Sequence, residues 1–205
     1  MATKALVFDF GGVLMDWSPR YLYRQFFNGD LAATDRFLEE IGFAAWNQEF
    51  DRGRPFGEGI AELAARFPHY RELIQIYDQR WDETLAGPIE ATVAILGELK
   101  NAGYPLYGLS NWSAEKFAAV RKRYPLFAWF DTIVLSGEEK LIKPDPRIFE
   151  LLLSKIGRSA GECLFVDDSP HNIAVAQSLG FDTVLFESPV RFKTELLQKG
   201  YSLGN

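Results

Sequence analysis

The sequence predicts a doubly wound α/β fold, with helices on both faces of a parallel sheet and a helical segment inserted after the first strand. Short, nearly continuous apolar runs recur along the chain and end at glycines or small polar residues. Such runs are typical of strands that are buried on both faces. From Ile89 onward they alternate with segments of helical periodicity, which is the order of elements in a doubly wound sheet.

Five apolar runs are expected to form the parallel sheet, at residues 5–10, 105–109, 132–135, 163–166 and 183–186. Helices are expected between them, at residues 89–102, 113–124, 146–156 and 172–179. Glycines follow three of these helices, and glycine is a common residue just past a helix end. The alternation therefore extends from Ile89 to Phe186.

The segment between the first strand and this alternating part has a different pattern. It contains no convincing strand, and its amphipathic stretches read as helices at residues 21–27, 33–41, 59–67 and 72–81. We therefore expect a core domain formed by residues 1–16 and 86–205, and a small helical domain formed by residues 17–85.

The composition excludes several classes of protein. With 22 Lys and Arg against 28 Asp and Glu, the net charge of −6 argues against nucleic acid or an anionic membrane as a partner. The single cysteine, Cys163, excludes an intramolecular disulfide framework and a multi-cysteine zinc site. No apolar run is long enough to span a membrane, and the N-terminal residues lack the pattern of a signal peptide. We expect a soluble, cytoplasmic protein.

Polar residues gather where the expected strands end. In an open parallel sheet, ligands bind beyond the carboxyl ends of the strands. Carboxylates are hard ligands that suit Mg²⁺, while a lysine and a hydroxyl suit anionic oxygens. Each residue alone could equally form a turn or cap a helix, but together they predict a divalent-metal phosphate site. The residues concerned are Asp9, Gly11, Ser110, Asn111, Lys143, Asp167 and Asp168.

Four short segments carry a resemblance to a known family. Residues 8–14, 109–111, 143–146 and 165–169 resemble the four motifs of the haloacid dehalogenase-like (HAD) superfamily, and they occur in the family's order. The inserted helical segment resembles the family's cap domain of the first class, so the resemblance covers nearly the whole chain. It implies a Rossmann-like core with a helical cap, and a Mg²⁺-dependent phosphatase acting on a small phosphorylated metabolite, such as a sugar phosphate.

The resemblance also implies a role for each matching residue. Asp9 would be the nucleophile that forms an aspartyl-phosphate. Ser110 would bind a phosphoryl oxygen, and Lys143 would bridge Asp9 and the phosphoryl group. Mg²⁺ would be held by Asp9, the carbonyl of Gly11, Asp167 and Asp168.

Further residues are expected to contact the substrate. Gly12 and Asn111 would do so from the core, and Arg52 and Arg54 from the cap. The segment 46–55 concentrates charged residues beside aromatic ones, which suits a hydroxylated leaving group. A solvated linker between cap helices explains this segment equally well.

Gly11 departs from the family's pattern. The phosphatases of the family usually have a second aspartate there, which serves as general acid and base. A glycine carbonyl can still bind a metal, but proton delivery, typically worth ~10²–10⁴-fold, is lost. Asp16 and His171 are near the motifs in sequence, although a solvated position explains both better. The sequence therefore identifies no replacement acid.

Two other functions remain open. A metal-independent 2-haloacid dehalogenase would use the same nucleophile, but dehalogenases of the family typically have tyrosine at the position of Gly11 and neutral residues in place of Asp167 and Asp168. Adjacent carboxylates without a cation would repel each other, which favours the metal-dependent phosphatase. The third possibility is a catalytically weak protein of the same fold that binds a phosphorylated ligand.

Overall fold

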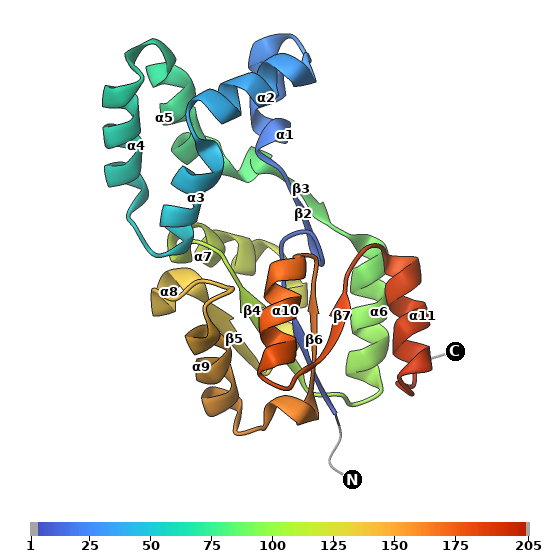
Figure 1. Cartoon of the computed structure of the whole chain (residues 1–205). Helices are drawn as coiled ribbons and strands as arrows, with labels where there is room; N and C mark the ends of the chain where they lie inside the picture. Colours follow the sequence, from blue (N-terminus) through green and yellow to red (C-terminus); the bar gives the residue numbers. More distant parts are fainter. Residues whose placement is uncertain (1–3, 204–205) are drawn as a thin grey trace.

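The fold is described here from a computed structural model, which describes residues 4–203. Five strands form one sheet in the order β5-β4-β1-β6-β7, and every neighbouring pair is parallel (Figure 1). The strands are β1 (Ala5–Phe8), β4 (Leu106–Ser110), β5 (Thr132–Leu135), β6 (Cys163–Asp167) and β7 (Asp182–Leu185). The predicted doubly wound α/β fold is confirmed, and all five expected strands are present.

The helices of the core cover both faces of this sheet. They are α6 (Glu90–Asn101), α7 (Ala114–Arg123), α8 (Ser136–Glu139), α9 (Pro146–Ile156), α10 (Pro170–Ser178) and α11 (Pro189–Gln198). Successive residues of a strand point to opposite faces, so β1 supplies Leu6 and Phe8 to one apolar cluster and Ala5 and Val7 to the other. Helices α8 and α11 add to the four helices expected from the sequence.

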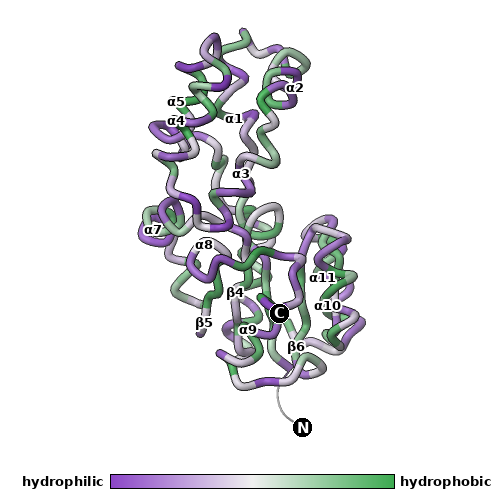
Figure 2. Tube along the Cα trace, turned by 60° about the vertical axis from the view of Figure 1, so that its left-hand side comes forward, coloured by the Kyte–Doolittle hydropathy of each residue, from purple (hydrophilic) through white to green (hydrophobic). Residues whose placement is uncertain are grey.

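Five helices form a block between β1 and the rest of the core. They are α1 (Pro19–Tyr23), α2 (Leu31–Glu40), α3 (Phe43–Asp51), α4 (Phe56–Arg66) and α5 (Arg71–Gln79), and we call residues 19–84 the helical block. In Figure 2 the tube alternates between hydrophilic and hydrophobic colours along α2 and α11, as expected for amphipathic helices. The apolar faces of the block enclose aromatic rings that pack against one another, among them Tyr23, Phe43 and Tyr77.

Helix α3 occupies residues 46–51 of the segment 46–55, so the alternative of a solvated linker does not hold for most of this segment. Phe43, Trp46 and Phe50 are buried on one face of the helix, at spacings of three and four residues. Only the turn after Asp51 is irregular. Gly53 has a φ of +90°, and a Cβ there would lie 2.7 Å from the carbonyl oxygen of Gly137 in α8. The helical block therefore meets the core in backbone contact at this turn.

A short antiparallel ribbon joins the block to the core. It consists of β2 (Met15–Trp17) and β3 (Leu85–Pro88), and the sequence analysis predicts neither strand. The chain enters the helical block through β2 and leaves it through β3. The block lies over the carboxyl ends of the parallel strands (Figure 1). Within residues 4–203, no helix is both long and apolar enough to cross a membrane.

Candidate active site

Three strand ends and one loop bring four polar side chains into contact at the edge of the sheet. Asp9 follows β1, Ser110 ends β4 and Asp167 ends β6, while Lys143 comes from the loop between α8 and α9. Ser110 Oγ donates a hydrogen bond of 2.8 Å to Asp9 Oδ1. Lys143 Nζ lies 3.0 Å from Asp9 Oδ1 and 2.7 Å from Asp167 Oδ2. The structure thus assembles the residues that the sequence predicts.

Asp167 is the structural centre of this group. It is completely buried, and besides Lys143 it accepts hydrogen bonds from the backbone N–H of Ser169 and from Asn172 Nδ2. Asn172 lies in the first turn of α10, and the sequence analysis assigns it no role. A buried carboxylate needs such partners, and a polar residue in the helix turn that follows a strand-end acid is the signal that could have identified Asn172.

Asn111 fixes the backbone that carries Lys143. Its Oδ1 accepts a hydrogen bond of 2.8 Å from the Lys143 N–H, and its Nδ2 donates one of 3.0 Å to the Lys143 carbonyl. The sequence analysis expects Asn111 to bind substrate. In the structure its side chain holds the lysine loop in place, and Asn111 also lines the neighbouring cavity, so the substrate contact stays a prediction.

The carboxyl groups of this site outnumber its one ammonium group, and their pKa values reflect this imbalance. Burial raises the pKa of Asp9 to about 7; Lys143 opposes this shift, whereas Asp167 and Asp168 add to it. Burial and the nearby Asp167 also raise the pKa of Asp168. Burial acts to lower the pKa of Lys143, but Asp9 and Asp167 outweigh it, so that pKa lies above its usual value. One ammonium group therefore faces three carboxyl groups.

The same carboxyl groups fit a hard divalent metal. Asp9, Asp167 and Asp168 each offer one oxygen, and these oxygens lie within 4.8 Å of one another. Oxygen-only donor sets of this kind suit Mg²⁺, which keeps several waters and needs few protein ligands. The chemistry and the spacing of the residues therefore fit the metal.

Gly12 shapes the position of Asp168. Its φ is +72°, and a Cβ at Gly12 would lie 2.2 Å from Asp168 Oδ2. The Gly12 N–H donates to the carbonyl of Met15 in the turn that leads to β2. The sequence analysis expects Gly12 to bind substrate, whereas here its N–H is engaged in the turn and its missing side chain leaves room for Asp168.

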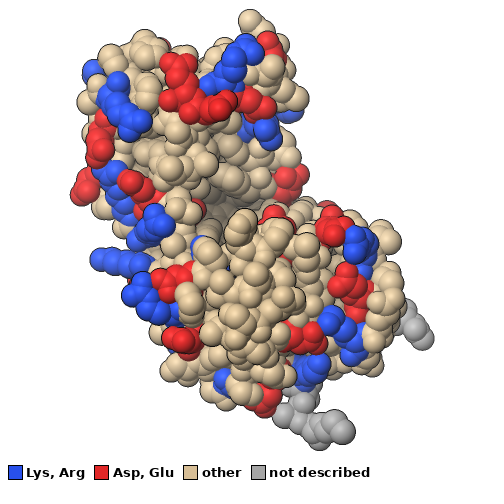
Figure 3. Space-filling view, in the orientation of Figure 1, with Lys and Arg blue, Asp and Glu red and all other residues tan. Residues whose placement is uncertain are grey.

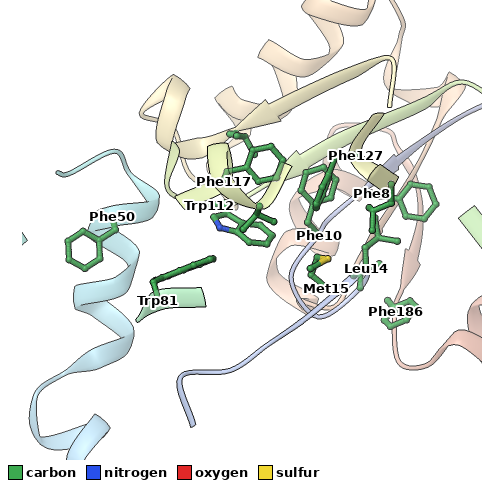
Figure 4. Close-up of a cluster of buried hydrophobic side chains, with 14 of the residues drawn as sticks. Phe8, Phe10, Leu14, Met15, Phe50, Trp81, Trp112, Phe117, Phe127 and Phe186 are labelled. Atoms are coloured by element: carbon green, nitrogen blue, oxygen red, sulfur yellow. The ribbon is translucent and has the colours of Figure 1, made fainter. Parts of the chain in front are cut away.

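A cavity lies between this edge of the sheet and the helical block. The cavity has a volume of about 90 Å³ and opens to solvent. Figure 3 shows the hollow between the two lobes, with few charged residues at its rim, and in Figure 4 Trp81 and Trp112 lie between α3 and the core. The lining residues are Gly11, Trp17, Asn47, Asp51, Phe56, Trp81, Asn111, Trp112 and Ser113.

The structure does not bring the two expected arginines of the block into this cavity. Arg54 pairs with Glu49 and Glu62 and lines a separate depression beside α4. Arg52 is exposed, and neither residue is among those that line the cavity. The helical pairing of α3 with α4 turns Arg54 outward, so the block contributes aromatic side chains, Asn47 and Asp51 instead.

The two acids considered from sequence proximity also lie elsewhere. The carboxylate of Asp16 accepts a hydrogen bond from the Tyr21 hydroxyl, at 2.9 and 3.0 Å from its two oxygens. His171 is exposed in the first turn of α10. Neither is among the residues that line the cavity.

Comparisons with known proteins agree with this geometry. A family model described as haloacid dehalogenase-like hydrolase matches residues 3–180. A sesquiterpene phosphatase of Aspergillus oryzae is 30% identical, with 86% of each chain covered. A D-ribitol-5-phosphate phosphatase of Bacteroides thetaiotaomicron is 29% identical over 94% of this chain and 96% of its own.

A solved structure shares the fold. It is that of a HAD family enzyme from Bacteroides thetaiotaomicron, in complex with magnesium and inorganic phosphate. It superposes with a TM-score of 0.66 at 25% identity, covering 91% of this chain and 95% of that chain. The strand order, the residues at the strand ends and the family match lead to one conclusion: the chain is a hydrolase that belongs to the haloacid dehalogenase-like family.

Proposed function

We propose that the protein is a Mg²⁺-dependent phosphatase that hydrolyses a small phosphorylated metabolite through an aspartyl-phosphate on Asp9. The observation that carries this proposal is the position of the Asp9 carboxylate, which contacts both the Ser110 hydroxyl and the Lys143 ammonium beside two further carboxyl groups. The relatives named above as phosphatases support the same chemistry.

The two oxygens of Asp9 differ in their contacts. Oδ1 accepts from Ser110 Oγ and from the backbone N–H of Phe10, and it also contacts Lys143 Nζ. All three contacts, which come from within the described residues 4–203, are made by Asp9 Oδ1 and none by Asp9 Oδ2. Three donors therefore fix the carboxylate, and Oδ2 is the oxygen that can approach the phosphorus atom of a bound ester.

The reaction would proceed in two displacements. Asp9 attacks phosphorus, the bond from phosphorus to the leaving-group oxygen breaks, and the leaving group departs with a proton. Water then attacks the aspartyl-phosphate, which releases inorganic phosphate and regenerates Asp9. Covalent catalysis of this kind replaces one difficult step by two easier ones. Ser110 and Lys143 would hold the phosphoryl oxygens beside the nucleophile during both displacements.

Asp9, Asp167, Asp168 and the carbonyl of Gly11 would hold the Mg²⁺ ion. When bound, the ion supplies positive charge that favours the ionised form of Asp9 and offsets the charge of the phosphoryl group. Asn172 and Ser169 would keep Asp167 oriented toward this position, because their donors already engage its carboxylate.

The cavity would hold the leaving group of the substrate. Its walls combine the rings of Trp17, Phe56, Trp81 and Trp112 with the polar groups of Asn47 and Asp51. Such a lining suits a metabolite that presents both apolar surface and hydroxyl groups. The helical block would act as a cap over the core, with residues 17–85 forming the cap domain and residues 1–16 and 86–205 the core domain.

The proposal is tested by phosphate release from p-nitrophenyl phosphate and from a panel of sugar phosphates, with Mg²⁺ or with EDTA. We expect release that requires Mg²⁺ and is lost in Asp9→Asn. Chloride release from 2-haloacids without metal would instead establish the dehalogenase. Binding of phosphorylated ligands without any turnover would establish a binding protein.

A further inference from the structure

The cavity is open where the family's usual acid would lie. A Cβ at Gly11 would have no other atom within 4 Å, so no side chain of the core fills the place of the missing aspartate. Gly11 nevertheless lines the cavity. A proton donor for the leaving group must therefore come from another wall of the same cavity.

Asp51 is the one ionisable side chain among the residues that line the cavity. It ends helix α3, next to the turn where the helical block meets α8. Because Asp51 belongs to the block and Gly11 to the core, the two residues approach the cavity from different domains of the proposed architecture.

Hydrogen bonds hold the carboxyl group of Asp51 in this position. Asn47 Nδ2 lies one helical turn earlier and donates to Asp51 Oδ2 at 3.2 Å, while the Tyr77 hydroxyl donates to Asn47 Oδ1. Ser113, a residue of the core, lines the same cavity as Asp51. The side chain of Asp51 is thus positioned by contacts within α3 and, through Asn47, from α5, as a group that must reach a substrate requires.

The surroundings of Asp51 favour its protonated form. Burial raises its pKa to about 7, and the negative charge of Asp9 adds to this shift. The Ser113 backbone, Arg52 and Lys143 oppose the shift, and the Tyr77 hydroxyl faces Asp51 from α5. A general acid works best when its pKa lies near the working pH, so the environment of Asp51 suits proton transfer at neutral pH.

We propose that Asp51 is the general acid and base of the reaction, in place of the aspartate missing at Gly11. This inference rests on the proposed phosphatase function. In the first displacement the Asp51 carboxyl gives its proton to the leaving-group oxygen as the bond to phosphorus breaks. In the second, the Asp51 carboxylate takes a proton from the attacking water. Each cycle thus returns Asp51 to its starting protonation state and consumes one water.

The decisive variant is Asp51→Asn, which keeps the size and hydrogen bonding of the side chain but cannot transfer the proton. p-Nitrophenol leaves without protonation, whereas an alcohol does not. Because kcat/KM reports only the first displacement, we expect kcat/KM on an alkyl phosphate to fall by ~10²–10⁴-fold, the usual value of a positioned acid, while kcat/KM on p-nitrophenyl phosphate stays close to that of the parent protein. Glu49→Gln, on the same helix but lining the separate depression, is the matched control and should affect neither ester.

Two further measurements separate proton transfer from a structural role. For the parent protein, kcat/KM on the alkyl ester should fall as the pH rises through about 7, because only the protonated carboxyl can donate; this limb should be absent in Asp51→Asn. Adding Gly11→Asp to Asp51→Asn should restore alkyl hydrolysis, since the space at Gly11 is open.

Equal losses of kcat/KM on both esters, or no loss on either, would overturn the role of Asp51. So would a parent protein that cleaves the aryl ester but no alkyl ester, because no acid would then be at work. Each of these results leaves the phosphatase function in place. If the parent protein cleaves neither ester, the proposed function itself fails, and the inference fails with it.

Discussion

The candidate site has two walls that are built in different ways: the strand-end group of the core, which we call the core wall and which lies next to the cavity without lining it, and the side of the helical block, which lines the cavity. On the core side, Asp9, Ser110, Lys143 and Asp167 come from distant parts of the sequence and meet through contacts of 3.0 Å or less. On the side of the helical block, aromatic rings and one carboxyl group face the cavity, and their neighbours are mostly other rings. Under the proposed function, the core wall would bind the phosphoryl group, whereas the other wall would contact the leaving group.

This difference separates chemistry from specificity. Parallel strands in register place their carboxyl ends at one edge, so the groups that handle the phosphoryl group are fixed by the sheet itself. The wall of the block depends on how α3, α4 and α5 pack, and it can vary without disturbing the sheet. Substitutions in the core wall should therefore abolish the reaction on every ester, and those in the block should change which esters react.

The largest effect is expected for Asp9→Asn. The amide is nearly the same size but cannot attack phosphorus, so activity should fall by ~10³-fold or more on aryl and alkyl phosphates alike. Initial rates with both esters measure this, with circular dichroism to confirm that the variant is folded. A loss confined to one ester would contradict the separation of the two walls.

Lys143→Met should be the next most damaging change. It leaves the buried carboxylates of Asp9 and Asp167 without their shared ammonium, and breaking a buried pair in this way costs about 3–5 kcal/mol of folding free energy. Urea denaturation measures the loss. The control is Arg54→Met in the block, where the partners Glu49 and Glu62 are solvent-exposed, so about 1 kcal/mol or less is expected. Similar losses in the two variants would contradict this contrast.

The neighbouring glycines of the core wall should respond differently to alanine. In Gly12→Ala the new Cβ would collide with Asp168 Oδ2 and the φ of +72° would be strained, whereas in Gly11→Ala the Cβ meets nothing. We expect Gly12→Ala to reduce the Mg²⁺-induced rise in melting temperature and Gly11→Ala to preserve it. Thermal melts with and without Mg²⁺ test this, and an equal metal response would place the ion away from Asp168.

The smallest effect is expected for Trp81→Phe in the wall of the block. The centroids of the Trp81 and Trp112 rings lie 5.9 Å apart. Replacing the indole of Trp81 by a smaller phenyl ring should weaken contact with a bulky leaving group. We expect KM to rise several-fold for such an ester, in line with the ~0.5–1.5 kcal/mol of an aromatic contact. Inhibition by inorganic phosphate should not change; a weaker inhibition would show that the wall also acts on the phosphoryl group.

Three residues of the core wall could be predicted from sequence because each stands at the end of an apolar run, whereas Lys143 comes from a loop. Asp9, Ser110 and Asp167 stand at the ends of strands whose buried pattern identifies the sheet. Asn172 and the positioning role of Asn111 were not predicted, since they depend on which hydrogen bonds form after the loops have folded.

The wall of the block could be predicted only in part. The apolar spacing of Phe43, Trp46 and Phe50 indicates α3. This helix was not predicted, because the charged residues after Trp46 favoured a linker. Whether Asp51 or Arg54 faces the cavity depends on the packing of α3 against α4 and the core. A one-residue difference in where a helix ends changes which side chain faces the cavity. Sequence periodicity does not fix helix ends to within one residue.

The central claim is that Asp9 itself accepts the phosphoryl group, and rapid acid quenching of the protein during turnover tests it most directly. The protein is mixed with Mg²⁺ and p-nitrophenyl phosphate, quenched within the first turnover and digested for peptide mass spectrometry. The account predicts one added phosphoryl group on the peptide that contains Asp9, absent in Asp9→Asn. Phosphate release without this adduct, or an adduct on another peptide, would contradict it.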